Sequence, residues 1–112
     1  MTTEDVRRRG MTPSMRDALE IAGRAGGAVY VDVDVDVCDR SVAPACPASI
    51  PGGLSAAELR EAVYLAGLHQ QVRAMDIVEV DATADTADGR TVRLAALCVL
   101  EACAGLVKRR PR

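Results

Sequence analysis

At residues 29–39 the chain reads VYVDVDVDVCD, a stretch in which valine alternates with aspartate. This period of two predicts a β-strand with its valines on one face and its carboxylates on the other. Asp32, Asp34 and Asp36 would then follow one another at about 7 Å, the two-residue repeat of a strand. Carboxylates that share a face repel each other unless cations or donors neutralise them, and hard divalent cations bind such oxygen ligands. The stretch is therefore a candidate metal site.

Two other interpretations explain less of this stretch. A solvated edge strand would leave the valine face unburied, and aspartate is a poor strand residue. An EF-hand loop also begins D-x-D-x-D, but Val37 stands where that loop needs glycine and Ala43 where it needs glutamate. Asp32 is expected to have a structural role beside the metal pair. Asp39 is expected to cap the following loop by accepting nearby backbone N–H groups.

The composition restricts the partners of the chain. Its 112 residues suffice for one domain or part of one, and 49% of them are hydrophobic. A net charge of −2 argues against nucleic acid and anionic membranes as partners, and no apolar run has the length of a membrane span. The four cysteines form no C-x-x-C pair, which favours a reduced, cytoplasmic chain over a disulfide framework.

The remaining patterns alternate helices with strands. Residues 1–11 are polar and are expected to be disordered. Thr12-Pro13 predicts a helix start, and that helix should stop at Gly26-Gly27. Ser55 and Glu58 form a capping box for a second helix that runs to about His69. A second strand is predicted over residues 72–80 and a third helix over residues 91–107.

The third predicted helix is apolar on nearly all sides, so the helix and its Cys98 and Cys103 are expected to be buried. The order helix, strand, helix, strand, helix predicts the α/β class with a parallel sheet. Two parallel strands rarely stand alone, so this sheet is expected to be part of a larger one. A loop as long as residues 38–54 is expected to be functional.

Three motifs in this chain resemble those of the ureohydrolases, the family of arginase, agmatinase and formimidoylglutamase. The first is Asp34-Val35-Asp36-x-x-Asp39, and it is followed by Ala43-Pro44-Ala45 and Pro51-Gly52-Gly53-Leu54. This succession is similar to the last metal-binding motif of the family. Residues 75–81, MDIVEVD, resemble the family's Asp-x-x-Glu strand end. The resemblance extends over essentially the whole chain.

The resemblance implies a three-layer α/β/α sandwich with a parallel sheet and a site for two Mn²⁺. Asp34 would bridge both ions, Asp36 would bind one of them, and Glu79 would accept hydrogen bonds from a small-molecule amidine or guanidino substrate. It also implies a metal-bridging hydroxide as the nucleophile, so that no side chain of this chain is assigned as catalytic. Full-length members commonly form homo-oligomers, trimers or hexamers.

The chain also departs from the family pattern. The Asp-x-His-x-Asp and Gly-Gly-Asp-His motifs are missing, and the single histidine, His69, belongs to neither. The chain would thus supply two of six protein ligands, which makes residues 1–112 resemble the C-terminal portion of one ureohydrolase domain, inactive by itself. Val37, Arg40 and Ala48 make the loop more similar to formimidoylglutamase-like members than to arginase, so the resemblance implies a formimidoylglutamase- or agmatinase-like hydrolase of C–N bonds. The alternatives are a non-catalytic interaction or assembly module and a simple binder of cations.

Overall fold

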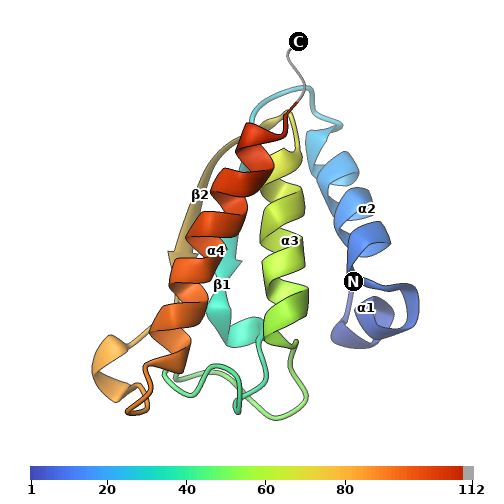
Figure 1. Cartoon of the computed structure of the whole chain (residues 1–112). Coiled ribbons are helices and arrows are strands. Elements are labelled where there is room, and N and C mark those ends of the chain that lie inside the picture. Colours follow the sequence, from blue (N-terminus) through green and yellow to red (C-terminus); the bar gives the residue numbers. More distant parts are fainter. Residues whose placement is uncertain (110–112) are drawn as a thin grey trace.

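The computed structural model describes residues 1–109, in which two parallel strands alternate with helices (Figure 1). In chain order the elements are α1 (Thr3–Arg9), α2 (Met11–Gly23), β1 (Val29–Asp34), the 3₁₀ turn η1 (Val35–Val37), α3 (Ala56–Leu68), β2 (Val72–Val78), the 3₁₀ turn η2 (Ala82–Ala84) and α4 (Arg90–Val107). The predicted α/β class with a parallel sheet is confirmed.

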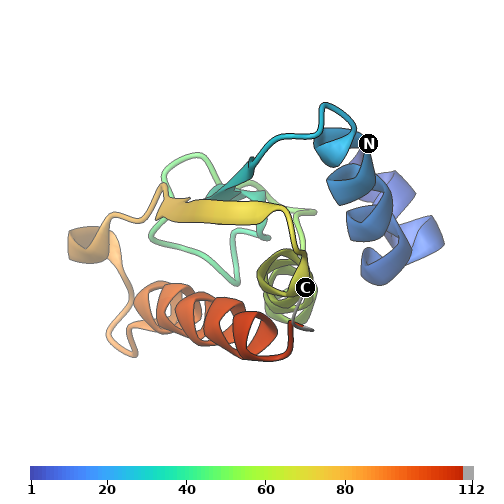
Figure 2. The ribbon, with the colours of Figure 1, turned by 90° about the horizontal axis from the view of Figure 1, so that it is seen from above.

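The two strands form a sheet that has helices on one face. Val31 and Val33 of β1 and Met75 and Ile77 of β2 turn toward α3 and α4, where they join the main core. On the opposite face, no helix of residues 1–109 covers the sheet (Figure 2), and Tyr30 is 61% exposed there. The described residues therefore form two layers of an α/β arrangement.

Helices α3 and α4 pack closely because small residues lie between them. The predicted capping box starts α3: Ser55 Oγ accepts the Glu58 N–H, and the Glu58 carboxylate accepts the Ser55 N–H at 2.8 Å. Further along, a Cβ added to Gly67 would lie 2.4 Å from the Ala102 carbonyl oxygen, so only glycine permits this spacing. Leu59 of α3 and Leu94 and Cys98 of α4 belong to the main hydrophobic core.

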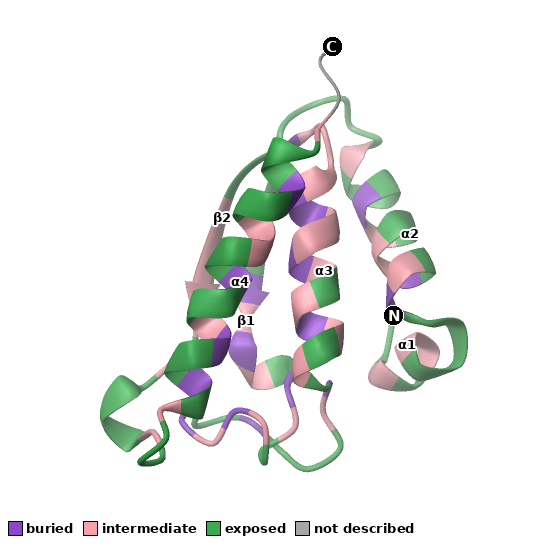
Figure 3. Ribbon diagram, viewed as in Figure 1, coloured by how far each residue is buried: buried purple, intermediate pink, exposed green. Residues whose placement is uncertain are grey.

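The prediction that α4 is buried on nearly all sides is wrong for the described residues. Buried positions follow a single stripe, and the other sides of the helix are exposed (Figure 3). Leu100, for example, is 63% exposed, and Cys103 is exposed as well, whereas Cys98 is buried as predicted. The reason is that, among the helices and strands of residues 1–109, α3 alone packs extensively against α4, although the sequence of α4 is apolar enough for more neighbours.

The N-terminal segment is also more regular than its polar sequence predicts. Instead of a disordered end, residues 3–9 form α1, which starts with a capping box between Thr2 and Asp5. Helix α2 then begins at Met11, one residue before the predicted cap, because Gly10 at φ 89° turns the chain between the two helices. The predicted end at Gly26-Gly27 comes late, since α2 stops at Gly23.

The loop after η1 is held together by the Asp39 carboxylate. It accepts the N–H and the hydroxyl of Ser41 and, across the loop, the N–H of Gly52 at 2.7 Å. These hydrogen bonds, first that from the Ser41 hydroxyl, lower the pKa of Asp39 to about 2. The expected role of Asp39 as a loop cap is confirmed. Among residues 1–109 no helix is both long and apolar enough to span a membrane.

The α3–α4 contact predicts a steric effect. We expect Gly67→Ala to lower the free energy of unfolding by about 1–3 kcal/mol, because the new methyl group overlaps the backbone of Ala102. Gly27→Ala is the matched control, since a Cβ at Gly27 meets no atom within 4 Å. Urea denaturation of both variants measures the difference, and equal stabilities would contradict the tight helix contact.

The Asp39 network predicts a dependence on pH. The pKa of Asp39 is about 2 in the folded chain, below its usual 3.8, so its hydrogen bonds stabilise the fold above pH 4. This contribution is lost as the pH falls toward 2. We therefore expect Asp39→Asn to be less stable than the parent chain at pH 7, with a difference that shrinks below pH 4. A gap that stayed constant with pH in urea titrations would refute this role.

Candidate metal and substrate site

The predicted site residues meet where both strands end. Asp34 is the last residue of β1, Asp36 lies in η1, and Glu79 directly follows β2. Because the strands are parallel and adjacent, with Asp34 opposite Val78, these ends share one edge of the sheet. In Figure 1 this edge faces the loops at the bottom of the view, away from the C-terminus.

The backbone departs from the predicted strand at Asp34. The alternation suggested that Asp32, Asp34 and Asp36 all project from one face of a strand, but β1 ends at Asp34 and η1 contains Asp36. The cause is local, because the Asp34 carboxylate accepts the N–H of Asp36 at 3.1 Å and caps the turn. The turn replaces the 7 Å strand repeat and brings the two carboxylates together.

The neighbouring carboxylates of the site act on the titration of Asp36. The pKa of Asp36 is raised, first by burial, then by a hydrogen bond between its carboxyl group and Asp34, and then by the charges of Asp34 and Glu79. A cation between these groups would relieve the repulsion among the carboxylates. The carboxylates of the site therefore lack a neutralising positive charge.

Glu79 adopts a backbone conformation that few residues with a side chain accept. Its φ is +65°, in the left-handed region, which costs roughly 1–2 kcal/mol for a residue with a Cβ. Two residues later, the Asp81 N–H donates to the Ala45 carbonyl oxygen at 2.9 Å. The turn after β2 is thus tied to the loop after η1, which fixes the segment that carries Glu79. Residues in such strained conformations cluster at functional sites.

Two residues beside the site, Ser49 and Cys46, were not predicted from the sequence. Ser49, buried, donates its hydroxyl to the Asp36 carbonyl oxygen at 3.3 Å. Cys46 is fully buried, and its pKa is raised by burial; a hydrogen bond with Ser49 opposes this, and the nearby charges of the site carboxylates add to it. The only sequence signal was the length of the loop that contains both residues.

The carboxylates at this edge are the kind of ligand that divalent cations bind, but they are too few to complete a metal site. Carboxylate oxygens suit Mn²⁺, and Asp34 and Asp36 share one pocket of negative charge. Within residues 1–109, however, no group of three or more His, Cys, Asp or Glu side chains has the arrangement of a metal site. His69 caps the far end of α3, before β2 begins, and does not join the cluster.

Asp32 and Asp76 lie in mid-sheet, away from this cluster. They face each other across the two strands, and Tyr30 on the same face forms a hydrogen bond with Asp76 that raises the pKa of Tyr30. The other carboxylate oxygen of Asp76, Oδ1, is buried without a partner. Neither aspartate belongs to the carboxylate cluster.

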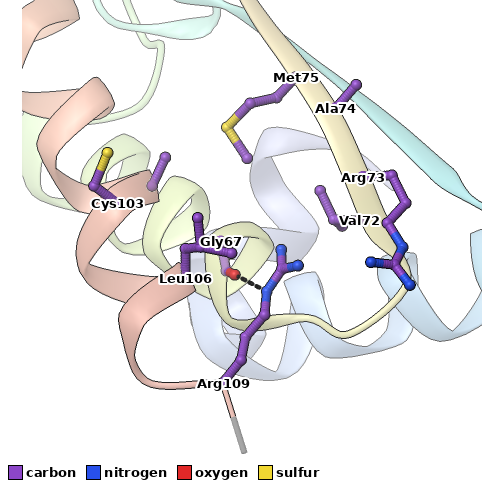
Figure 4. Close-up of a pocket in the computed structure, with 9 residues that line it drawn as sticks. Gly67, Val72, Arg73, Ala74, Met75, Cys103, Leu106 and Arg109 are labelled. Carbon is purple, nitrogen blue, oxygen red and sulfur yellow. Dashed lines mark hydrogen bonds between the residues drawn. The ribbon is translucent and has the colours of Figure 1, made fainter. Parts of the chain in front are cut away.

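A separate pocket of about 360 Å³ lies between β2 and the ends of α3 and α4. Met75 and Val72 border it on one side and Cys103 and Leu106 on the other, and Arg109 donates to the Gly67 carbonyl oxygen at 2.6 Å across its floor (Figure 4). None of the predicted site residues lines it. The pocket is therefore distinct from the carboxylate site.

Comparison with known proteins agrees with the motifs. The family model described as the Arginase family matches residues 1–105. Formimidoylglutamase of Bacillus subtilis is 39% identical over 105 residues, which are 94% of this chain and 33% of the relative. The crystal structure of that enzyme superimposes with a TM-score of 0.91 at 37% identity, covering 99% of this chain and 35% of the other.

A further neighbour was solved with manganese. The structure of Trypanosoma cruzi formiminoglutamase with Mn²⁺ has a TM-score of 0.81 at 29% identity, covering 96% of this chain and 34% of the other. The chain spans about a third of the length of the curated relatives it matches. Its helices and parallel strand pair are those of an arginase-like α/β fold. Sequence and structure together place this chain in the Arginase family.

Proposed function

We propose that this chain forms part of the active site of a ureohydrolase-type hydrolase that cleaves C–N bonds in linear amidines, with formimidoylglutamase-like specificity. The observation that carries the proposal is the convergence of Asp34, Asp36 and Glu79 at one edge of the sheet. The family match and the similarity to formimidoylglutamases support the reaction class and the substrate preference.

Each carboxylate has a distinct role in this proposal. Asp34 and Asp36 would hold manganese, because they are adjacent oxygen donors in an uncompensated field of negative charge. Bound manganese ions supply an activated water for attack on the amidine carbon. Glu79 would accept N–H groups from the planar, cationic amidine, a geometry that suits a carboxylate acting with both oxygens. The hydrogen bond from the Asp81 N–H to the Ala45 carbonyl oxygen ties the turn that carries Glu79 to the loop beside this edge.

The loop over residues 38–54 would form one wall of the substrate site. Ser49 from this loop donates to the main-chain carbonyl oxygen of Asp36, the charges of the site carboxylates help raise the pKa of Cys46, and both residues are buried. Since this wall presents Ala48 rather than a larger polar residue, we expect it to suit the formimidoyl group better than the long guanidino substrate of an arginase. A cytoplasmic location and assembly into homo-oligomers complete the proposal.

Residues 1–112 alone should be inactive, because two ligands cannot hold a pair of metal ions in a reactive geometry. We expect activity after the purified chain is mixed with a polypeptide that carries the Asp-x-His-x-Asp and Gly-Gly-Asp-His motifs, in the presence of Mn²⁺. Release of ammonia, formamide or urea from formimidoylglutamate, agmatine and arginine identifies the substrate. Formimidoylglutamate is expected to react fastest.

In that mixture, Glu79→Gln should lower kcat/KM by about a hundredfold, because the amide loses the charge that pairs with the amidine. Glu20→Gln, on the exposed surface of α2, is the matched control. An inactive mixture would favour the alternative function, a non-catalytic assembly module. The exposed apolar side chains of α4, including Leu100, are the observation in favour of that alternative.

Cation binding tests the metal-holding role separately. We expect calorimetry to show weak Mn²⁺ binding to the chain alone, in about the millimolar range that sparse oxygen ligands give. The double variant Asp34→Ala, Asp36→Ala should abolish it, whereas Asp32→Asn, one step upstream, should leave it unchanged. Tight binding of two equivalents would show that the chain completes a site by itself and would overturn the expected inactivity.

A further inference from the structure

Helix α1 reaches the loop over the candidate site through one arginine. Arg7 donates from Nη2 to the carbonyl oxygen of Gly52 at 2.6 Å and to that of Gly53 at 3.3 Å. Its two neighbours bind elsewhere: Arg8 pairs with Asp5 in the same helix, and Arg9 pairs with Asp17 of α2. Of the three consecutive arginines, Arg7 is thus the one that binds the loop.

The two halves of this loop are held by different parts of the molecule. Its first half is fixed to the core, because the N–H of Ala45 donates to the buried Thr91 hydroxyl at 3.1 Å and its carbonyl accepts the Asp81 N–H. The second half, residues 50–52, is exposed, and Ile50 there is 68% exposed. The Gly52 N–H donates to the Asp39 carboxylate, and the carbonyl oxygens of Ile50 and Gly52 accept from the Arg40 N–H and from Arg7. None of these partners is a buried side chain.

The residues that flank the second half of the loop link it to the site. Ser49, just before residue 50, donates its hydroxyl to the main-chain carbonyl oxygen of Asp36, and the side-chain carboxylate of Asp36 is a candidate metal ligand. At its other end Gly53 lies directly against the backbone after η1, since a Cβ there would come within 2.4 Å of the Cys38 carbonyl carbon. A shift of the glycine turn therefore moves both the Ser49 contact and the backbone that follows Asp36.

Helix α1 itself is suited to reversible docking. It has seven residues and none of them is buried. A helix of this length is unstable in isolation, so its order depends on the Thr2–Asp5 capping box and on contacts with the rest of the chain. Val6, which lines a groove together with Leu54 and Leu59, supplies an apolar contact beside the one from Arg7.

We propose that Arg7 is a positioning residue for the candidate site. Helix α1 acts as a strap, and Arg7 holds the glycine turn at Gly52-Gly53. The Ser49 hydroxyl thereby keeps its hydrogen bond to the Asp36 carbonyl oxygen. The role assigned to Asp36 rests on the proposed function, whereas the strap concerns only the folded chain. Loss of α1 docking loosens the loop and the turn that carries Asp36 without unfolding the core.

Hydrogen exchange of the full chain tests this proposal without any metal or substrate. We expect Arg7→Ala to speed amide exchange in residues 47–54 by about threefold to tenfold, the range of a partly exposed charged contact. The amide of Asp36, observed by NMR, should exchange faster as well, while residues 56–68 of α3 should not change. Arg7→Lys should restore part of the protection, because it keeps the charge and one donor group.

Arg8→Ala is the matched control, since it removes the same guanidinium group from the same helix without touching the loop. Unchanged exchange in residues 47–54, equal effects of Arg7→Ala and Arg8→Ala, or a loosened loop with an unaffected Asp36 amide would each overturn the proposal. Added salt offers a second measurement on the parent chain, because it should speed loop exchange by weakening the exposed contact. These results are independent of Mn²⁺ binding and of amidine hydrolysis, so either proposal can fail alone.

Discussion

The parallel pairing of β1 with β2 is the constraint on which the rest of the structure depends. Since both strands run in the same direction, the chain leaves the sheet twice at one edge, after Asp34 and after Val78. The connection between them must cross back over one face, and α3 makes that crossover while burying Val33 and Ile77. The loop over residues 38–54, the turn that carries Glu79 and the start of α4 are thereby gathered in one place.

The end of β1 converts this common edge into a site. A strand continued through Val37 would have kept the carboxylates of Asp34 and Asp36 about 7 Å apart. The Asp34 side chain instead captures the Asp36 N–H, the backbone turns, and the two carboxyl groups come within hydrogen-bonding reach. The same residue thus ends the strand and supplies one of the two candidate ligands.

The sequence predicted those features that depend on short-range patterns. The period of two in β1, the capping box at Ser55 and the apolar third helix gave the correct elements, and the motifs selected the carboxylates that meet at the edge. The end of β1 was missed because the alternation continues past the point where a side chain competes for the backbone. Helix α1 was missed although Thr2-x-x-Asp5 is a capping signal, since its polar sequence has no apolar face. Ser49 and Cys46 lie in a loop without periodicity, so their contacts with the site depend on the tertiary fold.

Charge repulsion and backbone strain destabilise the site, and packing of the neighbouring core offsets this destabilisation. Burial and the nearby carboxylates raise the pKa of Asp36, and Glu79 occupies a left-handed conformation, so both residues are held in unfavourable surroundings. Directly beside them, Val35 and Cys38 are fully buried and anchor η1 in the main core, while the Asp81–Ala45 hydrogen bond anchors the Glu79 turn. Burial of apolar groups thus holds three like charges at a spacing that they would not adopt by themselves. A site in that condition favours an added cation, because the cation removes a repulsion that the fold already sustains.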